Sequence, residues 1–284
     1  MQHATAPVGG GARMQVLICT SPAQAARSAA SAVLAGLPGA RKEACNDGLP
    51  PVLGLATGSS PLGLYAELGR AVERSEAWFG DAQGFALDEY IGLPAGHPQS
   101  YRRILEREVC AVIGLATHRL HVPDATAETT GTAAGFTRRA HDYERQIIDA
   151  GGIDVQILGI GVNGHLGFNE PGSALSSRTR VKRLAAQTRA DNARFFADPA
   201  DVPTHCLTQG LGTIARARRL VLIATGSGKA AAVAAAVEGA LSASCPASIL
   251  QWHPDAVVVL DGAAAARLRN RSYYDDAAAG LGTP

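Results

Sequence analysis

The chain has 284 residues, of which 46% are hydrophobic and 18% charged, with a formal net charge of +1 at pH 7. This composition predicts a folded globular protein rather than a disordered one, and the balanced charge gives no general attraction to nucleic acid or to an anionic membrane. Five cysteines without a C-x-x-C pair and the lack of a long apolar stretch argue against a disulfide framework, a closed zinc site and a membrane span, so we expect a cytoplasmic protein.

The first half of the chain alternates short apolar runs with longer amphipathic stretches, after a Gly- and Ala-rich arm at residues 1–13. Ser21-Pro22 followed by Gln24 predicts a capped helix start, because Ser accepts from the first-turn amides and Pro suits the first helical position. The elements expected here are a strand at 16–19, a helix at 22–37, a strand at 52–56, a helix at 61–74, a strand at 84–87 and a helix at 99–112.

The second half continues the same alternation. Expected here are a helix at 130–150, a strand at 153–160, a strand at 220–225, a helix at 228–241 and a strand at 256–260. Strands that alternate with helices predict an α/β fold, in which one doubly wound, mostly parallel sheet carries helices on both faces. No linker divides the chain, so we expect a single domain at residues 14–270 and a C-terminal tail at 271–284.

Polar residues follow the predicted strands at their carboxyl ends, where ligands bind in open α/β sheets. Thr57-Gly58-Ser59-Ser60 lies between a strand and a helix, so its hydroxyls and amides could cradle a phosphate; the alternative is an ordinary helix cap by Ser60. Thr225-Gly226-Ser227 repeats this arrangement and adds Lys229, although the upstream glycine of a nucleotide-binding P-loop is absent. The alternative for Lys229 is a solvated helix residue.

The segment Gly159–Gly164 matches the G-x-G-x-x-G pattern of dinucleotide-binding proteins. The residues that follow cannot propagate a helix, and no acidic residue stands about 20 positions downstream to hold a ribose, so we reject that interpretation. We expect instead a tight loop that presents His165 and Glu170, because a histidine beside a carboxylate can move protons near neutral pH. The alternative is a loop histidine bonded to the backbone.

Two adjacent carboxylates, Asp88 and Glu89, end the strand predicted at 84–87. Successive side chains of a strand point to opposite sides, so one of the two can face a shared cleft. We expect Asp88 to face the cleft and Glu89 to have a structural role. The alternatives for such a carboxylate are a helix cap or a solvated position.

Taken together, these motifs resemble those of the glucosamine-6-phosphate deaminase family over about residues 14–261. The loop Asn-Gly-His-Leu-Gly-Phe-Asn-Glu-Pro at 163–171 is the most specific of them, because the related 6-phosphogluconolactonases usually carry Ala-Ser-Leu-Phe-Pro after the histidine. The other segments that carry the resemblance are 55–61, 87–93, 97–101, 177–182, 192–196 and 237–239. The resemblance implies a Rossmann-like sheet.

The resemblance also implies a reaction, in which D-glucosamine 6-phosphate and water give D-fructose 6-phosphate and ammonia during N-acetylglucosamine catabolism. It assigns ring opening to His165 with Glu170, and removal of the C2 proton to Asp88. It places the phosphate on Thr57, Gly58, Ser59 and Ser60, with charge-assisted contacts from Arg194 and Lys229. It implies no metal and no cofactor.

Further expectations concern positions where members of this family differ. Some members carry Asp in place of Asn163, and we expect the pH optimum to differ between the two types. Allosteric members bind N-acetylglucosamine 6-phosphate between subunits through residues that match Arg180 and Lys182; the alternative here is a solvated basic edge, and whether the chain forms a homo-oligomer stays open. Residues 191–203 are rich in turn formers, and we expect them to form a mobile lid that carries Arg194.

Three other functions compete with this interpretation. Two are enzymes on the same scaffold, a galactosamine-6-phosphate deaminase and a 6-phosphogluconolactonase. The third is a non-catalytic sugar-phosphate sensor, which we disfavour because the 13-residue arm is too short for a helix-turn-helix segment and the charge gives no DNA footprint.

Overall fold

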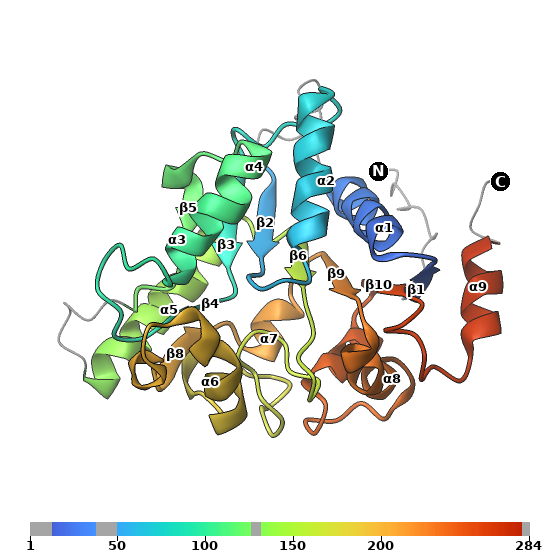
Figure 1. The fold of residues 1–284 in the computed structure, drawn as a ribbon. Helices are drawn as coiled ribbons and strands as arrows, with labels where there is room; N and C mark the ends of the chain where they lie inside the picture. The colour runs from blue at the N-terminus through green and yellow to red at the C-terminus, as the bar shows by residue number, and fades with distance from the viewer. Residues whose placement is uncertain (1–12, 38–49, 126–131, 280–284) are drawn as a thin grey trace, which may run out of the picture.

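A seven-stranded parallel sheet forms the centre of the computed structural model, which describes residues 13–37, 50–125 and 132–279 (Figure 1). The strand order is β1-β10-β9-β6-β2-β3-β5, and every neighbouring pair is parallel. Because both faces are covered, the inner strands are mostly apolar rather than alternating, although β6 contains the buried Gln156. The strands are β1 (Arg13–Cys19), β2 (Val52–Leu55), β3 (Gln83–Ala86), β5 (Leu120–His121), β6 (Val155–Leu158), β9 (Arg219–Ala224) and β10 (Asp255–Asp261).

Helices cover both faces of this sheet, as the sequence predicts. One face packs against α1 (Pro22–Gly36), α2 (Leu62–Glu73), α3 (Tyr101–Leu105) and α4 (Ala111–Ile113), with a π-helical turn at Glu106–Cys110 between the last two. The other face packs against α5 (Ala133–Asp149), α7 (Leu211–Ile214), α8 (Ala230–Glu238) and a 3₁₀ segment at Pro246–Trp252.

The first helix begins as the sequence predicts, with one difference in its cap. The Ser21 hydroxyl accepts from the Gln24 amide at 3.2 Å. The Gln24 side chain accepts from the Thr20 amide at 2.8 Å, one residue before the position that a capping box would use. Ala25, Ala29 and other small buried residues let α1 lie close to the sheet.

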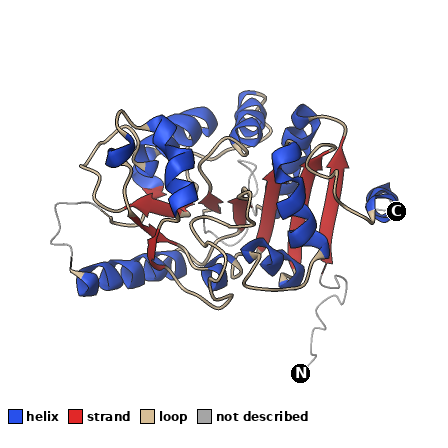
Figure 2. Cartoon of the chain, turned by 60° about the horizontal axis from the view of Figure 1, so that its bottom comes forward, coloured by secondary structure: helices blue, strands red, loops and turns tan. Residues whose placement is uncertain are grey.

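A second, three-stranded antiparallel sheet was not predicted. It consists of β4 (Asp88–Tyr90), β8 (His205–Thr208) and β7 (Arg180–Arg183), in the order β4-β8-β7 (Figure 2). The strands of this sheet are short, and β7 carries three cations. Neither the composition of β7 nor an apolar run therefore predicts a strand there. The prediction that Asp88 ends a strand of the parallel sheet is therefore wrong: Asp88 begins β4, where it pairs with Thr208.

The other differences concern short elements that were not predicted, among them β5, α6 (Ala186–Asn192) and α7, and the ends of predicted elements. The helix expected at 99–112 begins at Tyr101 and is interrupted by the π-helical turn, and the helix expected at 228–241 begins with a 3₁₀ turn at Ser227–Lys229. The expected arm lies outside the described residues except for Arg13, which starts β1. The first two residues of the helix expected from 130 also lie outside the described residues. In the C-terminal tail, α9 (Arg271–Ala279) contacts β1, and 280–284 lie outside the described residues.

Candidate active site

One cavity of about 400 Å³ lies at the carboxyl ends of β2, β6 and β9 and beside β4. Asp88 and His165 both line it, so the predicted base and the predicted imidazole share one pocket. All four predicted strand-end segments contribute lining residues to this cavity. The segment from Thr225 to Lys229 contributes Lys229 only. Thr57, Gly58, Ser59, Ser60 and Arg194 also line the cavity.

The glycines of the loop after β6 leave space for the candidate catalytic side chains. A Cβ atom at Gly161 would lie 2.3 Å from Nδ1 of the His165 ring, so the imidazole rests directly on this glycine. Gly167 has a φ of +54°, and a Cβ atom there would lie 3.0 Å from Oδ2 of Asp88. The G-x-G-x-x-G pattern therefore serves a tight loop under the histidine, as we expected.

The Glu170 carboxylate lies behind His165 and is held by several donors. Its Oε2 atom is 3.5 Å from Nδ1 of His165 and accepts a 2.7 Å hydrogen bond from Nδ2 of Asn163. Oδ1 of Asn163 accepts from the His165 amide at 3.2 Å, so this asparagine ties the loop to the carboxylate. Burial alone would raise the pKa of Glu170, but His165 and the donors Thr188 and Asn163 outweigh it and lower this pKa to about 2.

The pKa of Asp88 is raised, whereas that of Glu170 is lowered. Burial, and then the nearby charge of Glu89, raise the pKa of Asp88 to about 8, against hydrogen bonds from the Thr208 side chain and the Phe168 backbone. Glu89 is turned the other way and accepts from the amides of Tyr101 and Arg102, each at 2.9 Å, at the start of α3. This confirms the structural role predicted for Glu89.

The segment from Thr57 to Ser60 also lines the cavity, ahead of α2. Within the described residues no side chain caps α2, whose N-cap position is Pro61, so Ser60 is not an ordinary helix cap. Ala56, the residue after β2, is held by α2, because the Tyr65 hydroxyl donates to the Ala56 carbonyl at 2.9 Å and accepts from the Ala56 amide at 3.1 Å. The hydroxyls and amides of this turn are thus presented to the cavity by a rigid strand.

Two cations also line the cavity. The Lys229 ammonium donates to the Ile160 carbonyl at 2.7 Å, and burial lowers its pKa, so it is not the solvated helix residue of the alternative interpretation. The amide of Gly226, at the start of this turn, donates to both carboxylate oxygens of Asp261 at 3.1 Å. Arg194 is exposed, with its guanidinium 4.8 Å from the Phe195 ring centroid.

Two site residues were missed by the sequence analysis, and both lie on α6 (Ala186–Asn192). The Thr188 hydroxyl donates to Oε1 of Glu170 at 2.5 Å, and Nδ2 of Asn192 donates to the Tyr90 hydroxyl at 2.8 Å. The signal available was their spacing of four residues, which places both on one face of a helix. The polar composition of the segment hid that helix.

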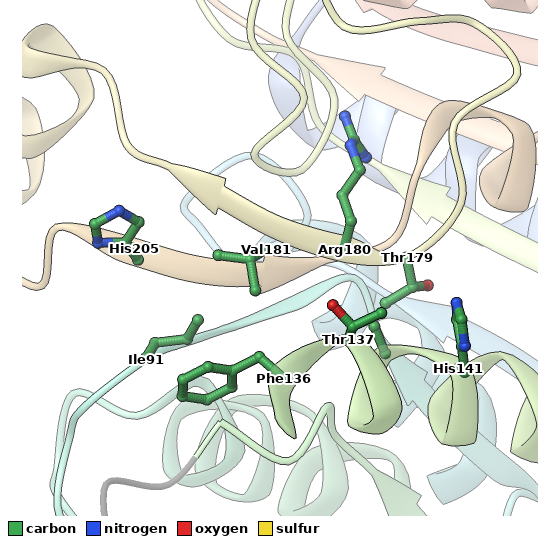
Figure 3. A pocket seen from close by; sticks show the side chains of 9 residues that line it. Ile91, Phe136, Thr137, His141, Thr179, Arg180, Val181 and His205 are labelled. Atoms are coloured by element: carbon green, nitrogen blue, oxygen red, sulfur yellow. The ribbon is translucent and has the colours of Figure 1, made fainter. Parts of the chain in front are cut away.

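Arg180 and Lys182 lie on β7, and neither is among the residues that line the cavity shared by Asp88 and His165. Figure 3 shows a separate groove between α5 and the smaller sheet, with Val181 and Phe136 facing it and the Arg180 side chain directed away from α5. Lys182 falls on the same side of β7 as Arg180, because side chains alternate along a strand. Burial lowers the pKa of Arg180.

The arrangement can bind a small anionic ligand and move protons on it. A carboxyl group with a raised pKa, an imidazole and two cations line one cavity. Within residues 13–37, 50–125 and 132–279, no group of three or more His, Cys, Asp or Glu side chains is placed to hold a metal ion.

Comparisons with known proteins find relatives over most of the chain. The family model "Glucosamine-6-phosphate isomerases/6-phosphogluconolactonase" matches residues 21–259. A glucosamine-6-phosphate deaminase of Beutenbergia cavernae is 55% identical over 225 residues, which cover 79% of this chain and 84% of the relative. The solved structure of a monomeric glucosamine-6-phosphate deaminase superposes with a TM-score of 0.79 at 35% identity, covering 89% of this chain and 100% of the other. A 6-phosphogluconolactonase of Trypanosoma brucei (TM-score 0.68, 19% identity, 90% and 99% covered) shares the fold.

Proposed function

We propose that this chain, which belongs to the family of glucosamine-6-phosphate isomerases and 6-phosphogluconolactonases, is a glucosamine-6-phosphate deaminase. The reaction converts D-glucosamine 6-phosphate and water into D-fructose 6-phosphate and ammonia, a step of amino sugar catabolism. The observation that carries the proposal is that Asp88 and His165 face one cavity together with Lys229. We assign the catalytic unit to residues 14–270.

In this proposal His165 opens the sugar ring. One proton must leave the anomeric hydroxyl and one must reach the ring oxygen, and an imidazole can serve both transfers near neutral pH. The Glu170 carboxylate, 3.5 Å from Nδ1, supports the imidazolium form while the proton is in transit. Asn163 holds that carboxylate in place through its 2.7 Å hydrogen bond.

Asp88 then acts as the base at C2. It removes the C2 proton to give an enolamine and returns a proton to C1, which leaves an iminium ion at C2. Water adds to that iminium carbon, and ammonia departs as the ketone forms. A carboxyl group whose pKa is about 8 is a stronger base than an exposed one. The substrate ammonium beside C2 favours the ionised form of Asp88, because opposite charges attract at short range.

The phosphate is assigned to the part of the cavity that lies before the start of α2. The hydroxyls and amides of Thr57, Gly58, Ser59 and Ser60 line this part, where backbone N–H groups favour an anion. Lys229 and Arg194 add positive charge. We also propose that residues 191–203 close over the phosphate; limited proteolysis tests this, because protection near Arg194 by substrate supports closure and unchanged cleavage contradicts it.

The decisive experiment is an assay of the purified protein. Ammonia and ketohexose phosphate are measured with glucosamine 6-phosphate, with its galacto epimer, and acid release is measured with 6-phosphogluconolactone. Ammonia from the gluco substrate with little turnover of the other two is expected. Because lactone hydrolysis needs no C2 proton transfer, Asp88→Asn separates the two chemistries: it should abolish deamination and spare a lactonase. Ammonia from neither epimer refutes the proposal.

We further propose that Arg180 and Lys182 bind N-acetylglucosamine 6-phosphate as an activator in a homo-oligomer. Both lie on one side of β7, and Arg180 pairs in register with Thr208, the residue that hydrogen-bonds Asp88. Adding N-acetylglucosamine 6-phosphate should lower the KM of the wild type and leave that of Arg180→Ala unchanged. An unchanged wild-type KM, or a single monomer mass by light scattering, contradicts this proposal.

The location we propose is the cytoplasm, where sugar phosphates are formed. None of the helices within the described ranges is both long and apolar enough to cross a bilayer. The described cysteines Cys19, Cys110, Cys206 and Cys245 are free thiols, which suits a reducing compartment.

A further inference from the structure

The Glu170 carboxylate is held from a second direction by α6. Thr188 is buried and lines the cavity, and its hydroxyl donates to Oε1 of Glu170 at 2.5 Å. The two residues are 18 positions apart in the chain. Asn163 holds the other oxygen, Oε2, at 2.7 Å. Each carboxylate oxygen therefore has its own donor, and the two donors come from different segments.

The segment 186–196, which begins with α6, also contacts Tyr90, a residue that lines the cavity. Asn192, one helical turn after Thr188, donates to the Tyr90 hydroxyl at 2.8 Å. Phe196 meets the Tyr90 ring edge-on and stacks on His97, with centroids 6.0 Å apart in both pairs. Arg194 lies between these two attachments and lines the cavity. Docking of 186–196 thus brings the Arg194 cation to the cavity and a hydroxyl to Glu170.

We propose that Thr188 is a positioning residue for ring opening: its hydroxyl keeps the Glu170 carboxylate beside His165 only while α6 is docked. This inference rests on the proposed deaminase function. At 3.5 Å the contact between Glu170 and the imidazole is too long to fix the carboxylate by itself. The donors Asn163 and Thr188 must do so. The segment that carries Arg194 therefore completes the proton-transfer pair when it docks.

Replacement of the hydroxyl by a methyl group tests this at constant shape. Thr188→Val fills the same volume but leaves Oε1 of Glu170 without its donor, and a hydrogen bond to a charged group typically accounts for about 10- to 100-fold in an equilibrium or rate. We expect kcat for glucosamine 6-phosphate to fall by about that factor and KM to change less than about threefold. Thr188→Ser restores the donor and should recover most of kcat.

An acyclic analogue separates ring opening from binding. The inhibition constant of 2-amino-2-deoxyglucitol 6-phosphate, which has no ring to open, should be nearly the same for the wild type and Thr188→Val. Gln187→Ala is the matched control on α6, because Gln187 is exposed and bonds Asp191 rather than the loop. Its kcat should stay within about twofold of the wild type.

The outcomes distinguish this inference from the proposed function. A wild type that releases no ammonia removes the function itself. If the wild type is active, an unchanged kcat in Thr188→Val overturns the positioning role. Three other results would show a general effect on folding and would also overturn the positioning role. They are a loss of kcat that Thr188→Ser does not restore, a similar loss of kcat in Gln187→Ala, and an equal weakening of acyclic-analogue binding in Thr188→Val.

Discussion

Replacing the buried Asp88, the proposed base, by Asn should reduce activity and increase stability, and the gain in stability should depend on pH. Burial raises the pKa of Asp88 from its ordinary 3.8 to about 8. Between these values the folded protein keeps a proton that the unfolded chain releases, so the wild type loses stability as pH rises through this window. Asparagine has no such proton to lose. The advantage of Asp88→Asn over the wild type should therefore grow from pH 5 to pH 8.

The size of this effect follows from the pKa. Three pH units inside the window, at about 1.4 kcal/mol per unit, give an upper limit of about 4 kcal/mol. Urea unfolding at pH 5 and pH 8 measures it as a change in the free energy of unfolding. The control is Asp142→Asn, since this side chain is 52% exposed on α5 and should leave the pH dependence unchanged.

The same variant should lose about 10²- to 10⁴-fold in deamination, because an amide cannot take up the C2 proton. A stability difference that is constant from pH 5 to pH 8, or that shrinks, would contradict the buried, proton-holding state of Asp88. Retained turnover would contradict its assignment as the base. The two readouts together show whether the stability given up at this position serves catalysis.

Three further substitutions test separate parts of the site and its support. Thr208→Val removes a hydrogen bond that favours ionised Asp88, so the pH at which kcat/KM reaches half its high-pH value should rise; an unmoved profile excludes this pairing. Lys229→Ala should raise KM about 10- to 100-fold and relieve competitive inhibition by inorganic phosphate, whereas an unchanged KM would place the phosphate elsewhere. Glu144 is buried on α5 and accepts from the Thr179 amide at 2.8 Å, so Glu144→Ala should cost about 2–4 kcal/mol in urea unfolding; a cost below about 1 kcal/mol would show that this contact is not structural.

The site divides into a rigid part and an attached part. His165 and Lys229 lie in segments that follow buried strands of the large sheet, and Asp88 begins β4, where it pairs with β8. Thr188 and Arg194 stand on a short helix and a 3₁₀ turn that are fixed by a few polar and aromatic contacts. Segments with few buried contacts open at low free-energy cost, so motion during turnover is expected in the second part.

Local patterns in the sequence determined most of the large sheet and most of the proposed catalytic groups. Continuous apolar runs such as 220–224 and 256–260 mark buried parallel strands, because helices cover both faces of such a sheet. Polar residues that directly follow those runs must gather at one edge, since parallel strands share a direction. His165 and Thr57 could therefore be placed in one site before any coordinates were known.

Only the tertiary structure decided the second sheet and the contacts that it positions. β4, β7 and β8 are short segments joined over long separations, and their pairing depends on which surfaces meet after the large sheet has formed. The raised pKa of Asp88 follows from that burial, and the donors on Glu170 come from residues 7 and 18 positions away. Local spacing cannot encode such contacts, because they depend on how distant elements pack.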